Sequence, residues 1–140
     1  MSNSSATIEL RRLLWVGPLT VVAAIVGVLI VRVVAVAVLQ PNPLPLSLMW
    51  LTPIIFTAVL VTGAVLVFAL VARFAPNPLR TYQIIAFVVL LLSLLPDVAY
   101  AGSGMPGANW PVAIALMVMH VVAWAICVWL LSRFSVAPAK

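Results

Sequence analysis

Four long apolar runs, separated by short polar or proline-rich breaks, make up most of the 140-residue chain. Each run reaches or approaches the ~20 residues that a helix needs to cross a hydrocarbon core of ~30 Å. Proline and glycine mark the breaks, since neither residue continues a regular helix easily. The pattern predicts an all-α fold: a transmembrane antiparallel four-helix bundle that forms a single membrane domain over residues 1–140. We expect the helices at approximately residues 13–39, 50–73, 78–101 and 110–132.

The three later runs share a start signal in which a short polar residue precedes a proline. These signals are Thr52–Pro53, Asn77–Pro78 and Asn109 with Pro111. A threonine or asparagine side chain can cap a helix, and proline is tolerated at the first helical position because its missing N–H would have no partner there. We therefore expect Thr52, Asn77 and Asn109 to be N-caps.

Composition independently indicates a membrane protein. Apolar residues make up 66% of the chain and charged residues 6%, and a soluble domain exposes far more polar surface than this allows. The single cysteine, Cys127, excludes an intrachain disulfide and a CxxC redox pair. The net charge of +5 is spread over the ends of the runs without clustering with aromatic residues, so we expect no nucleic-acid partner.

The basic residues predict an orientation. The connections at 40–47 and 102–109 carry no charge, whereas six of the seven basic residues fall on the other side of the predicted membrane. Because positively charged flanks stay cytoplasmic, we expect both termini in the cytoplasm. The six residues are Arg11, Arg12, Arg73, Arg80, Arg133 and Lys140.

Aromatic residues near the run ends fit the two interfacial belts of a membrane protein. We expect two groups, one on each side of the membrane. The inner belt would contain Trp15, Tyr82 and Phe134, and the outer belt Trp50, Tyr100 and Trp110.

Three ionisable residues remain inside the apolar runs: Arg32, Asp97 and His120. At 1.5 Å per residue they lie ~10, ~6 and ~13 Å from the outer helix ends, so all three fall in the outer half of the bilayer. Burying a charge at the centre of a membrane costs about 2.5–3.5 kcal/mol on insertion scales, and such groups usually face the bundle interior and pair. The simplest pairing is Arg32 with Asp97.

Further polar side chains fall at the same level, and we expect an outward-facing polar pocket between the helices. Ser93 shares a helix face with Asp97 at i, i+4 spacing. Pro96 frees the carbonyl of Leu92 as an additional acceptor. The candidate binding cluster comprises Arg32, Asp97, His120, Ser93, Tyr100 and Thr57.

Each of the three ionisable groups also has a simpler interpretation. Arg32 can extend its long stem toward the outer headgroups. Asp97 can sit at a frayed helix end after Pro96, in the interface. His120 can be neutral and bonded to a neighbouring helix. A cluster of the three can serve only to hold the bundle together.

The residue inventory argues against catalysis. One histidine and one membrane carboxylate are too few for a closed metal site, so we expect no metal and no cofactor. No serine or cysteine has an evident histidine partner, and the glycines of 102–107 lack the strand and lysine of a phosphate-binding loop. We do not expect an enzyme.

Two blocks carry a resemblance to a known family. NPLRTYQIIAFVVLLLSLLPDV and ALMVMHVVAWAICVWLLSRF resemble the third and fourth helices of a family of small bacterial four-helix membrane proteins of unknown function. The residues that carry it are Pro96 and Asp97 after the Leu/Ser run, and His120 in Met-His-Val-Val. The resemblance implies a bacterial plasma-membrane location and no known activity.

These observations predict a small, non-enzymatic, multi-pass protein of the bacterial plasma membrane, accessory or ligand-binding in function. Its expected partners are the lipid bilayer and either another membrane protein or further copies of itself. The alternative is a proton-linked transporter of a small solute that uses Asp97 and His120, since an acid and a histidine at one depth can relay protons.

Overall fold

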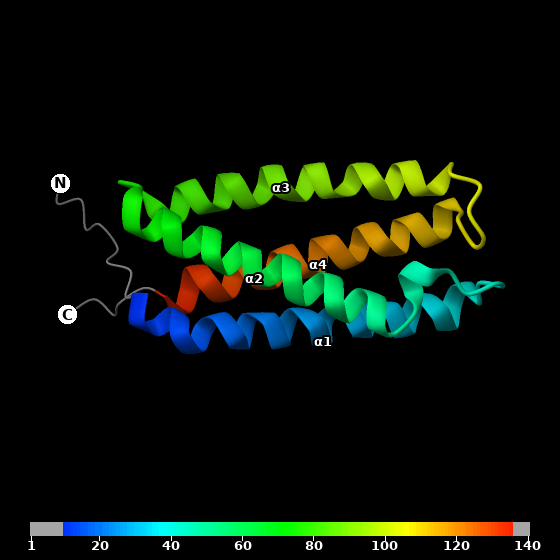
Figure 1. Cartoon of the computed structure of the whole chain (residues 1–140), viewed down its shortest axis with the longest axis horizontal. Helices are drawn as coiled ribbons and strands as arrows, with labels where there is room; N and C mark the ends of the chain where they lie inside the picture. Colours follow the sequence, from blue (N-terminus) through cyan, green and yellow to red (C-terminus); the bar gives the residue numbers. More distant parts are fainter. Residues whose placement is uncertain (1–9, 136–140) are drawn as a thin grey trace.

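The computed structural model describes residues 10–135 and contains four long antiparallel α-helices (Figure 1). All four are long and apolar enough to cross a membrane. The predicted all-α, four-helix membrane fold is confirmed. The helices are α1 (Leu13–Leu39), α2 (Leu51–Phe74), α3 (Pro78–Ala101) and α4 (Trp110–Phe134), and the short 3₁₀ segments are η1 (Leu10–Arg12) and η2 (Leu46–Leu48).

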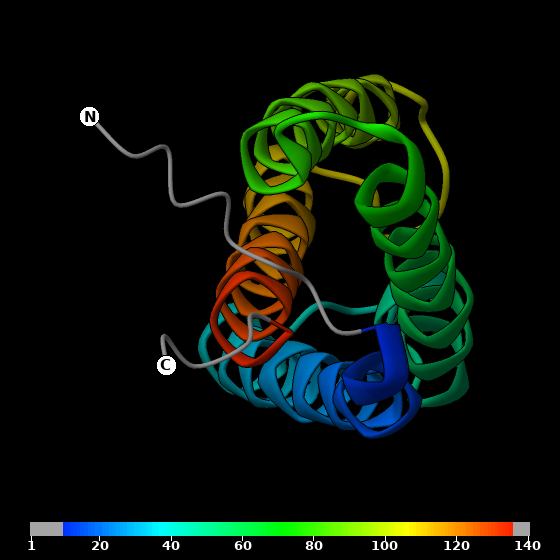
Figure 2. The same cartoon turned by 90° about the vertical axis from the view of Figure 1, so that its left-hand side faces the viewer.

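The helices form a ring in chain order, with α1 beside α2 and α4, and α3 diagonally opposite α1 (Figure 2). The start of α1, the 75–77 connection and the end of α4 share one end, called here the terminal end (Figure 1). The connections at 40–50 and 102–109 share the other, called here the two-loop end. The uncharged connections thus lie together, as expected. Lys140 lies outside the described residues.

The buried core is thin and divides into three layers along the bundle, because most apolar side chains point outward. Outward apolar surface is what a lipid solvent requires, since it is as apolar as the core itself. The terminal-end layer contains Leu13, Val16, Phe68, Tyr82 and Leu131; the middle layer contains Ala24, Val61 and Cys127; the two-loop layer contains Val28, Leu48, Val112 and Met119.

One of the three predicted caps forms a side-chain bond. Asn109 Oδ1 accepts from Val112 N at 3.0 Å, at the start of α4. Asn77 occupies the N-cap position of α3 without a side-chain cap bond. The prediction for Thr52 is wrong, because α2 already begins at Leu51 and Thr52 lies inside it.

The expected aromatic belts are present in part. Trp15, Trp50 and Trp110 are all more than half exposed. Tyr82 does not belong to a belt: it is 1% exposed and packs edge-on against Phe68, with ring centroids 4.9 Å apart. This part of the prediction is wrong because Tyr82 faces the interior, where its ring fills the terminal-end layer.

Candidate functional site

An acid and an imidazole meet across the interface between α3 and α4. Asp97 Oδ2 lies 2.9 Å from His120 Nδ1. The Asp97 side chain is 8% exposed and that of His120 30% exposed, so the carboxylate is enclosed while the ring stays partly open. Asp97 is on the last turns of α3 and His120 is in the two-loop half of α4. The antiparallel connection through 102–109 brings these two levels together.

The hydrogen bonds of this pair are incomplete. His120 Nδ1 also lies 3.0 Å from the carbonyl oxygen of Leu116, one turn earlier on α4. Two acceptor oxygens thus compete for Nδ1, which carries at most one proton. Within residues 10–135 Asp97 Oδ2 is therefore buried without a hydrogen-bond partner. Such an oxygen remains a free acceptor for a donor group.

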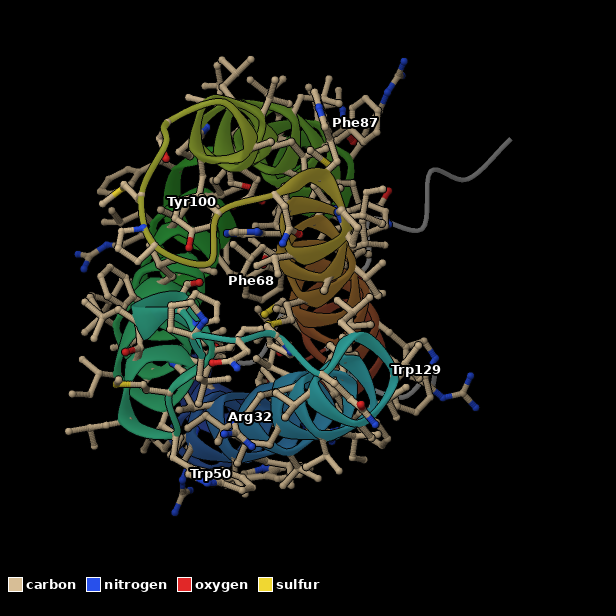
Figure 3. The ribbon with its side chains drawn as sticks, turned by 90° about the vertical axis from the view of Figure 1, so that its right-hand side faces the viewer. Arg32, Trp50, Phe68, Phe87, Tyr100 and Trp129 are labelled. Atoms are coloured by element: carbon tan, nitrogen blue, oxygen red, sulfur yellow. The ribbon has the colours of Figure 1, made fainter. Side chains whose placement is uncertain are left out.

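Arg32 is held by a different element. Its Nε donates to the carbonyl oxygen of Leu48 at 2.8 Å, and its guanidinium carbon lies 3.6 Å from the centre of the Trp50 ring (Figure 3). The residue is 5% exposed. The side chain thus reaches from α1 into η2 and the residues after it.

The predicted Arg32–Asp97 ion pair is wrong. Asp97 is paired with His120 instead. The reason is topological, because α1 and α3 are diagonal in the ring whereas α3 and α4 are neighbours. Arg32 instead satisfies a backbone carbonyl and covers an aromatic face, both of which favour a guanidinium.

The other candidate residues do not complete one cluster. Ser93 Oγ donates to the carbonyl oxygen of Leu90 on its own helix at 2.7 Å. Thr57 is buried on α2, and Tyr100 packs against the two-loop layer at the end of α3. The structure brings Asp97 and His120 together, whereas Arg32, Ser93 and Tyr100 have other contacts.

Chemically, a carboxylate beside an imidazole can hold or exchange a proton and can bind a donor group. Among residues 10–135, no group of three or more His, Cys, Asp or Glu side chains is placed to hold a metal ion. Cys127 is buried in the middle layer with Ala24 and Val61, where it acts as a small packing residue.

A surface groove between α3 and α4, near the terminal end, was not anticipated from the sequence. Its volume is about 390 Å³, and Arg133, Ser132 and Trp129 line one end of it. Trp124 and Val128 of α4 continue the groove toward the bundle middle, and Gln83 of α3 lines the opposite side. Within the described residues the Oγ of Ser132 is buried without a hydrogen-bond partner. The available signal was the spacing of Trp124, Val128 and Ser132, which share one helix face at four-residue intervals.

The four long apolar helices define a multi-pass, all-α membrane protein. The chain belongs to a family of unknown function, DUF6069, whose profile matches residues 5–137. The family resemblance noted for the third and fourth helices is thereby confirmed over nearly the whole chain. Comparisons with curated proteins and with solved structures return no match.

Proposed function

We propose that the protein is a small, non-enzymatic accessory protein of the bacterial plasma membrane, with both termini in the cytoplasm. It binds a ligand or a protein partner at the outward-facing two-loop half, around Asp97 and His120. The observation that carries this proposal is the incomplete bonding of the pair: one carboxylate oxygen lacks a donor, and the neighbouring ring is 30% exposed. Ionisable groups inside a membrane span are functional candidates by default because their burial is costly.

The geometry favours a ligand that supplies an N–H or O–H group. Asp97 Oδ2 needs a donor, and His120 Nδ1 already has the Leu116 carbonyl nearby. A hydroxyl or an amine that enters beside the ring would satisfy the carboxylate without disturbing the helix. A purely apolar ligand would leave the acceptor buried and unpaired, which costs about 1–3 kcal/mol.

Chemical modification of His120 tests whether the pair is open to ligands. His120 is the one histidine of the chain, so the absorbance of carbethoxyhistidine formed by diethyl pyrocarbonate reports on this residue alone in protein purified without a histidine tag. We expect His120 to react in folded protein in lipid nanodiscs, and a ligand to slow the reaction. Full reaction in denaturing detergent with none in nanodiscs would show that the site is closed and would overturn the proposal.

The orientation is tested separately by labelling a cysteine introduced at one end of the bundle or the other. Ser103 and Asn77 are both exposed, in connections at opposite ends of the bundle, and Cys127 is buried. In intact cells Ser103→Cys should react with a membrane-impermeant maleimide and Asn77→Cys should not. The reverse pattern would place the termini outside.

The second candidate function is proton-linked transport of a small solute, and the 2.9 Å carboxylate–imidazole contact favours it. Against it stands the terminal-end layer, a packed group of apolar and aromatic side chains between the pair and the terminal end. Vesicles that contain the protein and a pH-sensitive dye separate the two functions. Proton flux that Asp97→Asn abolishes would support transport, and vesicles that stay proton-tight would support the accessory role.

A further inference from the structure

The length of the groove between α3 and α4 is close to the thickness of the hydrocarbon part of one lipid leaflet. Its lining runs along α4 from Arg133 to Trp124, nine residues apart, which corresponds to ~13 Å of helix rise. Half of a hydrocarbon core is ~15 Å. The groove opens on the outer surface of the bundle, and Figure 3 shows Trp129 projecting away from the bundle axis on that side. In a membrane this face meets lipid.

The polar lining is rich in donors and lies at one end of the groove. Arg133 is exposed and carries a guanidinium, and Gln83 adds a carboxamide from α3. Beside them, the buried hydroxyl of Ser132 is without a hydrogen-bond partner among the described residues. The groove lining contains no carboxylate. A cationic, donor-rich end favours an anionic group with several acceptor oxygens, because guanidinium matches phosphate geometry.

Aromatic contacts place this polar end at the headgroup level. Phe134 packs edge-on against Trp129, with ring centroids 5.9 Å apart, and against Trp15, at 6.3 Å. Trp15 and Trp129 are both more than half exposed. Exposed tryptophans at a helix end mark the membrane interface, so Arg133 lies where phosphate groups lie and Trp124 lies beneath them, at the depth of acyl chains.

We propose that this groove binds an anionic phospholipid. The phosphate lies against Arg133 and Gln83, the hydroxyl of Ser132 donates to a phosphate or ester oxygen, and one acyl chain runs over Trp129, Val128 and Trp124 toward the bundle middle. The groove lining includes neither Asp97 nor His120, and His120 lies in the other half of α4. The lipid fills a groove formed by two helices and so contacts both.

Native mass spectrometry of the full-length protein in detergent tests the proposal. Phosphatidylglycerol and phosphatidylcholine with identical acyl chains are added in parallel, so that only the headgroup differs. We expect phosphatidylglycerol to bind more tightly. Arg133→Gln should weaken phosphatidylglycerol binding about fivefold, the effect expected of one basic residue at a lipid surface, and leave phosphatidylcholine binding unchanged.

Arg73→Gln is the matched control. Arg73 is also exposed and basic and also lies at the terminal end, but it belongs to α2, outside the groove lining. It should leave phosphatidylglycerol binding unchanged. An equal loss in both variants would show a general charge effect and overturn the proposal, as would equal binding of the two lipids by the unmodified protein.

A groove-filling variant tests the acyl-chain part without altering charge. Ala125 lines the groove and is exposed, so Ala125→Trp should occupy the space and reduce phosphatidylglycerol binding. Unchanged binding would overturn the placement of the chain. Circular dichroism of each variant in detergent shows that the helices persist, and if Arg133→Gln does not fold, Arg133→Lys tests the same site by removing the bidentate geometry.

Discussion

Asp97 and His120 face each other across the α3–α4 interface, with Oδ2 2.9 Å from Nδ1, and neither helix supplies the carboxylate oxygen with a hydrogen bond. The contact lies between two helices joined by a connection of eight residues, 102–109. It therefore needs little chain ordering beyond what the helices already have. The effect of a substitution on the free energy of unfolding therefore depends on which of the two side chains is replaced and by what.

Removing the imidazole should destabilise the protein more than neutralising the acid. His120→Leu leaves the Asp97 carboxyl buried without the group that faces it, and we expect a loss of about 1–3 kcal/mol in the free energy of unfolding. Asp97→Asn keeps the shape and provides an N–H donor, so its effect should be smaller. Unfolding by denaturing detergent, followed by circular dichroism, measures both.

The double variant Asp97→Leu/His120→Leu shows whether the two residues are coupled. Replacing both polar partners removes the unpaired group. The double variant should therefore be more stable than the summed effects of Asp97→Leu and His120→Leu predict. Additive effects would mean that the contact contributes nothing to stability.

The planar shape of the Arg32 guanidinium, and not its charge alone, should stabilise the protein. It donates to Leu48 O at 2.8 Å and stacks on Trp50 at 3.6 Å, and Lys cannot reproduce the planar stack. We expect Arg32→Lys to lower the thermal unfolding midpoint nearly as much as Arg32→Ala. Trp50→Ala should lose about 0.5–2 kcal/mol of unfolding free energy, the range of a cation–π contact.

Trp110→Ala serves as the control for Trp50, since Trp110 is equally exposed at the same end. It should leave the midpoint unchanged. Asp97→Asn should add to the effect of Arg32→Ala without altering it, because the two residues do not pair. A non-additive result would restore the ion pair that the sequence first suggested.

The sequence predicts the depth of a residue along the bundle better than it predicts which helices are in contact. Four apolar runs and their breaks suffice to place Asp97 and His120 in the same half of the bundle, since depth follows from residue count alone. The residue count does not show which helices are in contact. The helices are apolar on nearly every face, so hydropathy does not indicate which face of each helix points into the bundle. The diagonal placement of α1 and α3 therefore could not be predicted, and Arg32 was paired with the wrong residue.

A hydrogen bond to a backbone carbonyl cannot be predicted from the pattern of side chains along the sequence. The carbonyl of Leu48 becomes an acceptor for Arg32 only once η2 folds over the end of α1. The prediction for Tyr82 is wrong for a related reason. An aromatic residue near a helix end is typical of the membrane interface, but the position of Tyr82 around the axis of α3 directs its ring against Phe68. Both cases require knowledge of helix rotation, which the composition of these runs does not encode.

Gly27 allows α1 and α4 to approach closely. A Cβ at this position would lie 2.7 Å from Ile126 Cδ1 and 3.0 Å from Val122 Cγ1. Gly27→Ala should be tolerated with a small loss, because the Ile126 methyl is the end of a flexible side chain. Gly27→Leu should cost about 1–3 kcal/mol by overpacking, read as a lower midpoint of thermal unfolding.

Gly63 on α2 is the matched control, since nothing lies within 4 Å of a Cβ there. Gly63→Ala should raise stability by about 0.5–1 kcal/mol, because alanine loses less backbone entropy in a helix. If Gly27→Leu and Gly63→Leu behave alike, close approach at Gly27 plays no part in α1–α4 packing.

Three glycines of the 102–109 connection separate backbone strain from crowding. Gly102 has a φ of −100° and open space around it, so Gly102→Ala should be neutral. Gly104 has a φ of +70° and open space, so Gly104→Ala should cost about 1–2 kcal/mol through its left-handed backbone. Gly107 combines a φ of +77° with a Cβ position 2.8 Å from the carbonyl oxygen of Pro43. Gly107→Ala should therefore be the most destabilising of the three in thermal unfolding, because it also separates the two connections at this end. Equal losses at Gly104 and Gly107 would mean that the connections do not pack against each other in the folded protein.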